Sequence, residues 1–176
     1  MEMLSRLHHF DRRLFTRIFR QGERRAVIPL AIALSRSGDV YLYLMVPLLL
    51  WLLGVPALDD FLTLLLVAFA IERTLYRSLK NTLKRPRPPN AIPGFNSLIA
   101  TSDKFSFPSG HSSGAFLLAT ALVVIYGGPM LVIYLWAAGV ALSRVVLGVH
   151  FPGDILAGSL MGSSIALACA TLLGFN

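Results

Sequence analysis

Charged residues are scarce in this chain, and they almost vanish from its second half. Of the 176 residues, 14% are charged and 55% are hydrophobic, with a mean hydropathy of +0.67. A soluble domain of this length would carry about a quarter charged residues. Residues 105–143 and 155–176 contain no charged residue. Because about 20 apolar residues cross the hydrocarbon core, these runs predict transmembrane helices, and they exclude a disordered chain or an ordinary cytosolic enzyme.

Cysteine is nearly absent as well. The one cysteine, Cys169, cannot form an internal disulfide or a cysteine cluster for a metal, and we interpret it as a small packing residue. The first 25 residues lack the apolar region and cleavage site of a signal peptide. The sequence has no Walker loop, H-E-x-x-H pattern or carboxylate cluster. It therefore predicts no metal, no bound nucleotide and no other cofactor.

Arginine is abundant only at the N-terminus. Residues 1–25 interleave leucine, isoleucine and phenylalanine at helical spacing with seven arginines: Arg6, Arg12, Arg13, Arg17, Arg20, Arg24 and Arg25. This pattern predicts an amphipathic basic helix on an anionic membrane surface. The net charge of +7 would suit nucleic acid, but the hydrophobicity of the chain argues against that partner. We divide the chain into an interfacial N-terminal region, residues 1–34, and a membrane-embedded domain, residues 35–176.

Five apolar segments, separated by glycine and proline, cover most of the remaining chain: 40–54, 60–80, 110–126, 129–147 and 154–174. They predict an all-α polytopic membrane bundle with five transmembrane helices. The segment Ala26–Leu34 is too short to span alone and leaves a sixth span open. Gly158 and Gly162 form a small-xxx-small pair, which we interpret as close helix packing within the chain. The oligomeric state is not predicted.

Ionisable residues in or beside membrane spans are costly, so they are candidates for function. One cluster follows a single helix face with spacings of four and three: Arg73, Arg77, Lys80, Lys84 and Arg87. Such a stripe can bind an anion, but it is also typical of the basic flank of a membrane helix. Arg73 is beside Glu72, and we interpret those two residues as a structural ion pair. Pro86 predicts that the helix breaks at Arg85.

Two further clusters stand at the starts of apolar segments. Pro108-Ser109-Gly110-His111 precedes one of them, where the free N–H groups of a helix start can bind an anion. Ser143-Arg144 is followed by His150 and Asp154. A carboxylate four residues from a histidine can accept its N–H and make the other ring nitrogen more nucleophilic. Taken alone, such a pair is more often structural.

The predicted topology brings the three clusters together. The second span ends at the basic stripe and the third begins at His111, so these share a membrane face. Crossing twice returns the chain to that face at Arg144 and His150. Three cations, helix-terminal amides, two histidines and a carboxylate then suit a phosphate, because guanidinium groups pair with phosphoryl oxygens.

These residues resemble a known signature. Lys80-x6-Arg87-Pro88, Pro108-Ser109-Gly110-His111 and Ser143-Arg144-x5-His150-x3-Asp154 are similar to the three motifs of the type 2 phosphatidic acid phosphatase superfamily, with all eleven specified residues present. The resemblance runs from about residue 35 to the end of the chain. It implies an integral membrane enzyme that hydrolyses a phosphate ester without a metal, through a phosphohistidine.

The resemblance also implies a role for each motif residue. His150 is expected to be the nucleophile, Asp154 to orient it, and His111 to protonate the leaving oxygen. The expected phosphate ligands are Lys80, Arg87, Ser109, Gly110 and Arg144. Two histidines with opposite roles predict a bell-shaped pH–rate profile.

The expected substrate is a phosphate on a lipid, because the site lies at a membrane face among apolar helix ends. The resemblance implies an isoprenyl diphosphate such as undecaprenyl diphosphate, phosphatidylglycerol phosphate or phosphatidate, and the motifs do not choose among them. Two alternatives stay open: a lipid phosphotransferase with the same phosphohistidine, and a non-enzymatic protein that binds anionic lipids. Haloperoxidase chemistry of related folds is disfavoured by the hydrophobic spans.

The expected location is the bacterial cytoplasmic (inner) membrane. Basic residues flank the predicted spans almost wholly on the active-site face, which by the positive-inside rule favours the cytoplasmic side. The resemblance favours the opposite, extracytoplasmic face, and we expect the active site there. Phosphate binding accounts for most of these basic residues, which weakens the rule in this chain.

Overall fold

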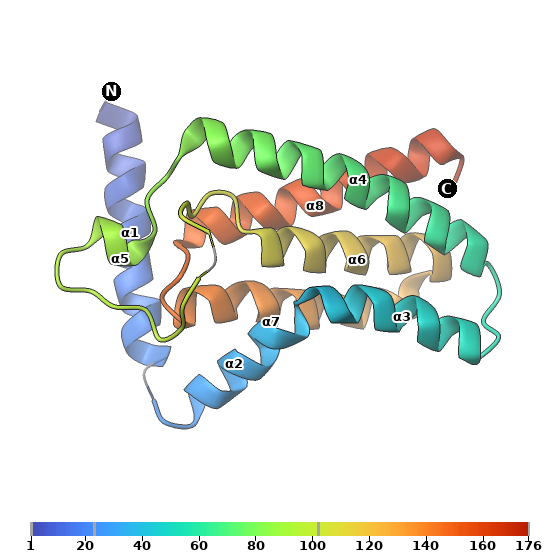
Figure 1. Ribbon diagram of the computed structural model, residues 1–176, viewed down its shortest axis with the longest axis horizontal. Helices are drawn as coiled ribbons and strands as arrows, with labels where there is room; N and C mark the ends of the chain where they lie inside the picture. Colours follow the sequence, from blue (N-terminus) through green and yellow to red (C-terminus); the bar gives the residue numbers. More distant parts are fainter. Residues whose placement is uncertain (1, 23, 102, 176) are drawn as a thin grey trace.

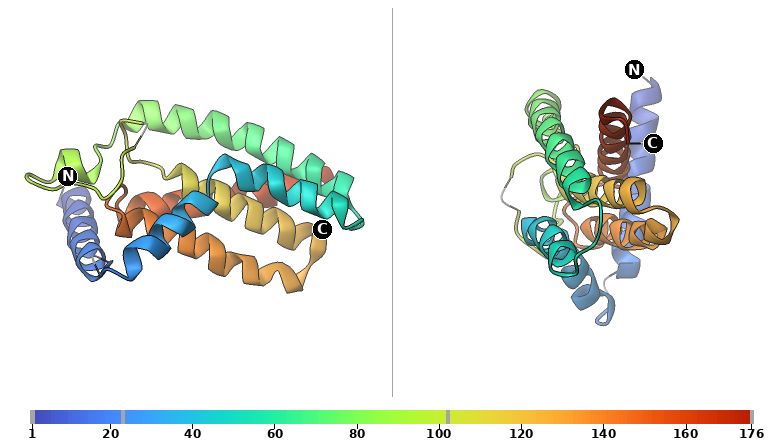
Figure 2. Two further views of the ribbon diagram at one scale, coloured as in Figure 1. Left: turned by 60° about the horizontal axis from the view of Figure 1, so that its bottom comes forward. Right: turned by 90° about the vertical axis from the view of Figure 1, so that its right-hand side faces the viewer.

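The computed structural model describes residues 2–22, 24–101 and 103–175, with the side chains of residues 1–7 outside the description. Helix α1 (Glu2–Gly22) crosses one end of a bundle of long helices, as Figures 1 and 2 show. The bundle consists of α3 (Val40–Leu52), α4 (Leu58–Leu83), α6 (Gly110–Tyr126), α7 (Ile133–Val146) and α8 (Pro152–Leu173). Shorter elements are α2 (Val27–Ser37), α5 (Pro88–Ala91) and the 3-10 helix η1 (Gly128–Val132). All named elements in these ranges are helices, which confirms the predicted all-α class.

Helix boundaries follow the glycine and proline positions. Helix α6 has the predicted bounds, and α7 is preceded by η1 after Gly127, whose φ is +82°. Helix α4 extends past the predicted 60–80 at both ends. It stops where Lys84 adopts a left-handed φ of +46°, two residues before Pro86, so the predicted break is confirmed.

Helix length and composition support fewer membrane spans than the five that the sequence pattern predicts. Within the described ranges, Gly128–Val146 and Pro152–Leu173 are long and apolar enough to cross a membrane. A third span results if α2 and α3, which meet at a bend of 64°, cross together. Helix α6 is apolar but has 17 residues, and α4 is long but carries several charges. Five spans therefore remain a prediction.

Helices α6 and α8 pack with their backbones in close approach. A Cβ at Gly158 or Gly162 would overlap the backbone carbonyl of Ser109 or Ser113. The small-xxx-small pair is thus used inside the chain, as interpreted from the sequence. Apolar residues of α4, α6 and α8 complete this core: Phe61, Leu64, Leu117, Leu118 and Ala166. The contact fixes the start of α6 against the start of α8.

Helix α1 is fastened across the bundle end by aromatic side chains. Phe15 and Phe19 are buried, with the Phe15 ring centroid 5.3 Å from that of Phe151 and the Phe19 centroid 4.8 Å from that of Phe95. The apolar face of α1 therefore packs on protein, while Arg17 on the other face is exposed. Its place at a membrane surface remains a prediction, as does the division at residue 34, which falls inside α2.

Candidate active site

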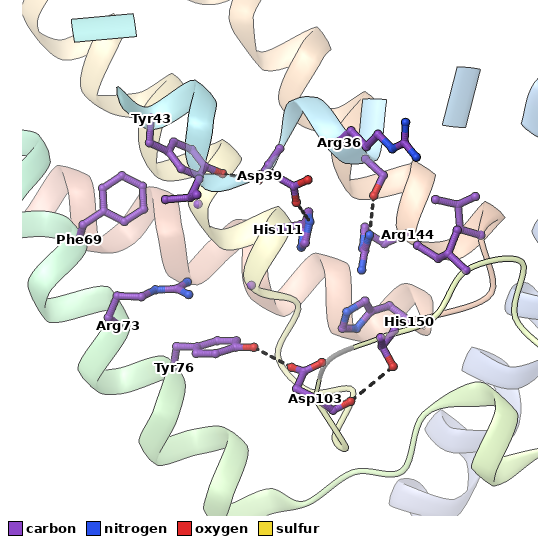
Figure 3. A pocket seen from close by; sticks show the side chains of 18 of the residues that line it. Arg36, Asp39, Tyr43, Phe69, Arg73, Tyr76, Asp103, His111, Arg144 and His150 are labelled. Atoms are coloured by element: carbon purple, nitrogen blue, oxygen red, sulfur yellow. Dashed lines mark hydrogen bonds and ion pairs between the residues drawn. The ribbon is translucent and has the colours of Figure 1, made fainter. Parts of the chain in front are cut away.

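The three motifs meet at the bundle end that α1 crosses, around a cavity of about 870 Å³. Five of the eight predicted site residues line it: Arg87, Gly110, His111, Arg144 and His150. The other three, Lys80, Ser109 and Asp154, are buried, and Lys80 and Asp154 contact the lining residues Asp103 and His150. Figure 3 shows residues of α4, α6, α7 and the connecting loops converging on this space.

His150 lies in the turn between α7 and α8 and is 2% exposed. Its Nε2 is 3.3 Å from Nη1 of Arg87, and its Nδ1 is 3.6 Å from Oδ2 of Asp154. Burial, together with Arg87 and Arg144, lowers the pKa of His150 to about 4, although Asp154 acts in the opposite direction. The imidazole is therefore neutral near pH 7, with one nitrogen turned to a carboxylate and the other to a guanidinium.

Asp154 is fully buried and held on both carboxylate oxygens. Oδ2 accepts the backbone N–H of Phe151 at 2.7 Å, and Oδ1 accepts from Nη1 of Arg85 at 2.6 Å. Arg85 also donates to Oδ2 of Asp11 in α1 at 2.5 Å, and Asp11 Oδ1 accepts the N–H of Gly153 at 2.8 Å. The sequence analysis named Arg85 only as the position of the helix break and did not single out Asp11.

Two predicted phosphate ligands share one carboxylate. Arg87 donates to the carbonyls of Val149 at 2.6 Å and Asp103 at 3.0 Å, and Lys80 donates to the hydroxyl of Tyr76 at 2.5 Å. Both cations form ion pairs with the Asp103 side chain. Burial would raise the pKa of Asp103, but Lys80 and Arg87 outweigh it and hold the pKa at about 2. A charged carboxylate, paired with both cations, thus lines the cavity, where Figure 3 labels Asp103.

The segment before α6 makes a capped helix start. Ser109 is the N-cap residue, and its Oγ accepts the N–H of Ser112 at 3.4 Å. The Ser109 N–H donates to the carbonyl of Asp154 at 3.0 Å, which ties the starts of α6 and α8 together. Gly110 lines the cavity beside Tyr76, whose ring is 3.1 Å from the place a Cβ would take. A side chain at residue 110 would press on that ring.

His111 and Arg144 have partners that sequence reasoning missed. His111 is 28% exposed, and its Nε2 is 2.9 Å from Oδ1 of Asp39. Arg144 is buried and donates to the hydroxyl of Ser35, while its Nε has no partner in the described residues. Both partners come from residues 35–39, where α2 gives way to α3, outside the three motifs. A charged Asp39 directly before the apolar run of α3 was the available signal, because charge beside a span is costly.

One wall of the cavity is apolar. It is formed by side chains of α2, α3 and α4: Ile32, Leu44, Leu65, Leu66 and Phe69. Arg73 also lines this side, with Nη2 donating to Oε1 of buried Glu72 at 2.7 Å and its guanidinium over the Tyr76 ring. The predicted structural pair of Glu72 and Arg73 is confirmed.

Comparison with known proteins identifies the family to which the chain belongs. The sequence model of the PAP2 superfamily matches residues 61–176. The chain is 33% identical over 142 residues to the putative undecaprenyl-diphosphatase YbjG of Escherichia coli, covering 77% of this chain and 68% of that protein. It is 36% identical over 110 residues to phosphatidylglycerophosphatase B of Bacillus subtilis, covering 56% of this chain and 51% of that protein. The crystal structure of Aquifex aeolicus LpxE superposes with a TM-score of 0.79 at 25% identity, covering 90% and 93% of the two chains.

The chain belongs to the PAP2 superfamily, as the motifs predict. The relatives are named as phosphatases of lipid phosphates, which confirms the predicted class, a membrane lipid phosphatase that hydrolyses phosphate esters. The match with the Bacillus protein spans about half of that protein's length.

Proposed function

We propose that the chain removes the terminal phosphate from a lipid phosphate or diphosphate through a phosphohistidine on His150. The observation that carries this proposal is the orientation of the His150 ring, with Nε2 beside Arg87 and Nδ1 facing Asp154. A neutral imidazole with a carboxylate behind it is an activated nucleophile. His111 and Arg144 line the same cavity.

The proposed reaction has two steps. In the first, Nε2 of His150 attacks phosphorus, the bond from phosphorus to the lipid oxygen breaks, and His111 gives a proton to the leaving oxygen. In the second, water attacks phosphorus, the bond from nitrogen to phosphorus breaks, and His111 takes a proton from the water. Inorganic phosphate leaves and His150 returns to its neutral form. Asp154 stabilises the charge on the phosphorylated ring.

Cations and amides surround the proposed phosphate position. Arg87, Arg144 and Lys80 supply the positive charge, and the amides at Gly110 and His111 supply helix-terminal donors. The Ser109 hydroxyl caps its own helix, so we assign it to fixing those amides in place. Asp103 contacts both Lys80 and Arg87, and an incoming phosphate therefore exchanges with that carboxylate.

The apolar wall indicates where the lipid lies. A cavity of about 870 Å³ accommodates a headgroup, and side chains of α3 and α4 continue it as a hydrocarbon surface. This supports a substrate with a long apolar chain, such as undecaprenyl diphosphate, phosphatidylglycerol phosphate or phosphatidate. Two of the relatives are named for substrates of the first two kinds.

For location, we propose five spans in the bacterial inner membrane, with α2 and α3 crossing as one broken span. Helix α1, the motif ends and the 84–109 connection then share a face, which we place outside the cytoplasm. The basic residues gathered on that face argue for the opposite orientation. In a Cys169→Ser background, Asn96→Cys and Gly128→Cys probe the two faces with an impermeant thiol reagent in intact cells. Labelling of Asn96→Cys alone supports this orientation, and labelling of Gly128→Cys alone reverses it.

Phosphate release by purified protein tests the proposed reaction. The three lipids are offered with a chelator present, and wild type is compared with His150→Ala. Release that resists the chelator and is lost in the variant is the expected result. Release that continues in the variant would remove His150 from its role. Phosphate found on an acceptor lipid instead of in solution would make the chain a phosphotransferase.

A further inference from the structure

The bend between α2 and α3 carries a carboxylate, Asp39, that does not cap its own helix. Asp39 stands at the N-cap position of α3 with an extended backbone, where an Asp side chain ordinarily accepts an N–H of the first turn. Asp39 makes no such bond. Its Oδ1 instead lies 2.9 Å from Nε2 of His111, 72 residues further along the chain.

Several contacts hold the bend in this place. Trp136 of α7 donates from Nε1 to the hydroxyl of Ser37 at 2.9 Å, and the Tyr43 hydroxyl donates to the carbonyl of Gly38 at 3.1 Å. A Cβ at Gly38 would come within 2.6 Å of Val140 and 3.4 Å of the His111 ring. The bend therefore packs directly on His111, and its geometry is set by α7 and α3 together.

We infer that Asp39 is a positioning residue for His111. The inference rests on the proposed function, in which His111 donates the proton to the leaving oxygen. With Nε2 on Asp39, the nitrogen left for the substrate is Nδ1. The carboxylate fixes the ring orientation and stabilises the imidazolium that exists before proton transfer, as the orienting carboxylate of a catalytic triad does for its histidine. Asp39 itself passes no proton to the substrate.

The surroundings of Asp39 favour this role over a purely structural one. Its side chain is 44% exposed and lines the cavity, as Figure 3 shows, so burial does not require a partner for it. Arg144, another charged residue that lines the cavity, donates to the hydroxyl of Ser35, four residues before Asp39. One short segment outside the three motifs thus contacts both His111 and Arg144.

Leaving-group dependence separates positioning from structure. A lipid alkoxide leaves only with a proton, whereas a nitrophenolate leaves without one. If Asp39 acts through His111, then Asp39→Asn slows cleavage of phosphatidate and spares a nitrophenyl phosphate that carries an alkyl chain. The measure is kcat/KM, because it covers only the steps up to formation of the phosphohistidine.

The experiment compares Asp39→Asn with Asp59→Asn, a matched change in the first turn of α4 at the opposite bundle end. We expect kcat/KM of Asp39→Asn to fall about 30-fold for phosphatidate and less than about threefold for the nitrophenyl ester, since general acid catalysis contributes about 10²- to 10⁴-fold. We expect Asp59→Asn to match wild type on both. Equal losses on the two substrates, or no loss on phosphatidate, would overturn the inference.

A double variant tests whether Asp39 acts through His111 or through a general effect on folding. In a His111→Asn background, adding Asp39→Asn is expected to change phosphatidate cleavage by less than about twofold, because the group it positions is gone. A further tenfold loss there would show that Asp39 acts elsewhere. If wild type cleaves neither substrate, the proposed function fails, which is a different outcome from a failure of the Asp39 inference.

Discussion

The two histidines of the site are held in different ways. His150 is almost completely buried, and its carboxylate partner Asp154 is fixed in turn by Arg85 and by Asp11 of α1. His111 is 28% exposed and depends on one carboxylate, Asp39, from a bend between two helices.

This difference matches the roles proposed for the two histidines, with His150 as nucleophile and His111 as acid. A nucleophile must meet phosphorus along one line, and an error of about 1 Å in its placement can cost about 100-fold in rate. Three elements, α1, α8 and the segment after α4, fix the carboxylate behind His150. An acid that serves a lipid leaving group has to lie beside the lipid, and His111 lines the same cavity as the apolar wall of α2, α3 and α4.

The strongest test of the comparison removes the nucleophile. His150→Asn is expected to lower kcat by about 10⁴-fold or more, because no other nitrogen is placed to take the phosphoryl group. The measurement is phosphate release from phosphatidate in detergent. The elution profile of the purified variant is compared with that of wild type to check folding. Residual activity within tenfold of wild type would contradict the assignment.

Removing Arg85 breaks the support of the nucleophile. In Arg85→Ala, Asp154 stays buried without its cation, which costs about 3 kcal/mol or more of stability, and a shifted His150 loses about 100-fold in kcat/KM. Thermal unfolding in detergent and kcat/KM measure the two effects. The control is Arg77→Ala, which removes an exposed arginine of the basic stripe on α4. If the two variants had the same thermal stability and the same kcat/KM, Arg85 would be only a basic residue at the end of a membrane helix.

The pH dependence sharpens the comparison. Attack requires neutral His150, and its lowered pKa of about 4 keeps the ring neutral until the pH falls through that value. The acid limb of kcat/KM is therefore expected near pH 4, with about tenfold loss at pH 3. The profile is measured with a diphosphate and a monoester, whose own ionisations differ. An acid limb near pH 6.5 on both substrates would mean that burial does not control this histidine.

The smallest effect is expected from α1. In Asp11→Asn the amide oxygen can still accept the N–H of Gly153, but the charge facing Arg85 is lost. We expect kcat/KM to fall about fivefold, which corresponds to about 1 kcal/mol of activation free energy. Arg13→Gln, on the exposed side of the same helix, serves as control. A loss as large as that of Arg85→Ala would mean that α1 itself fixes the nucleophile.

Much of the fold follows from local pattern. The predicted segment 110–126 and the break before Pro86 agree with α6 and the end of α4, because uncharged runs and proline act over a few residues. Spacing and topology were also enough to bring His111, Arg144 and His150 to one cavity. The span count stays open, since α4 mixes apolar and charged residues and α2 meets α3 at a bend.

The supporting residues could not be found in the same way. Asp39 and His111 are 72 residues apart, and Asp11 and Arg85 are 74 apart. Their pairing depends on the angle between α2 and α3 and on the crossing of α1 over the bundle end, and no local spacing encodes either. Arg85 was indistinguishable from a basic flank because its partner lies on another helix.

Trapping the phosphorylated enzyme tests the central claim most directly. Wild type is mixed with phosphatidate labelled in its phosphate, quenched with alkali within the first turnover, and digested for peptide mapping. Acid-labile, alkali-stable label on the peptide that contains His150, absent in His150→Asn, is the predicted result. Label on any other residue, or phosphate release at the wild-type rate from His150→Asn, would contradict the account.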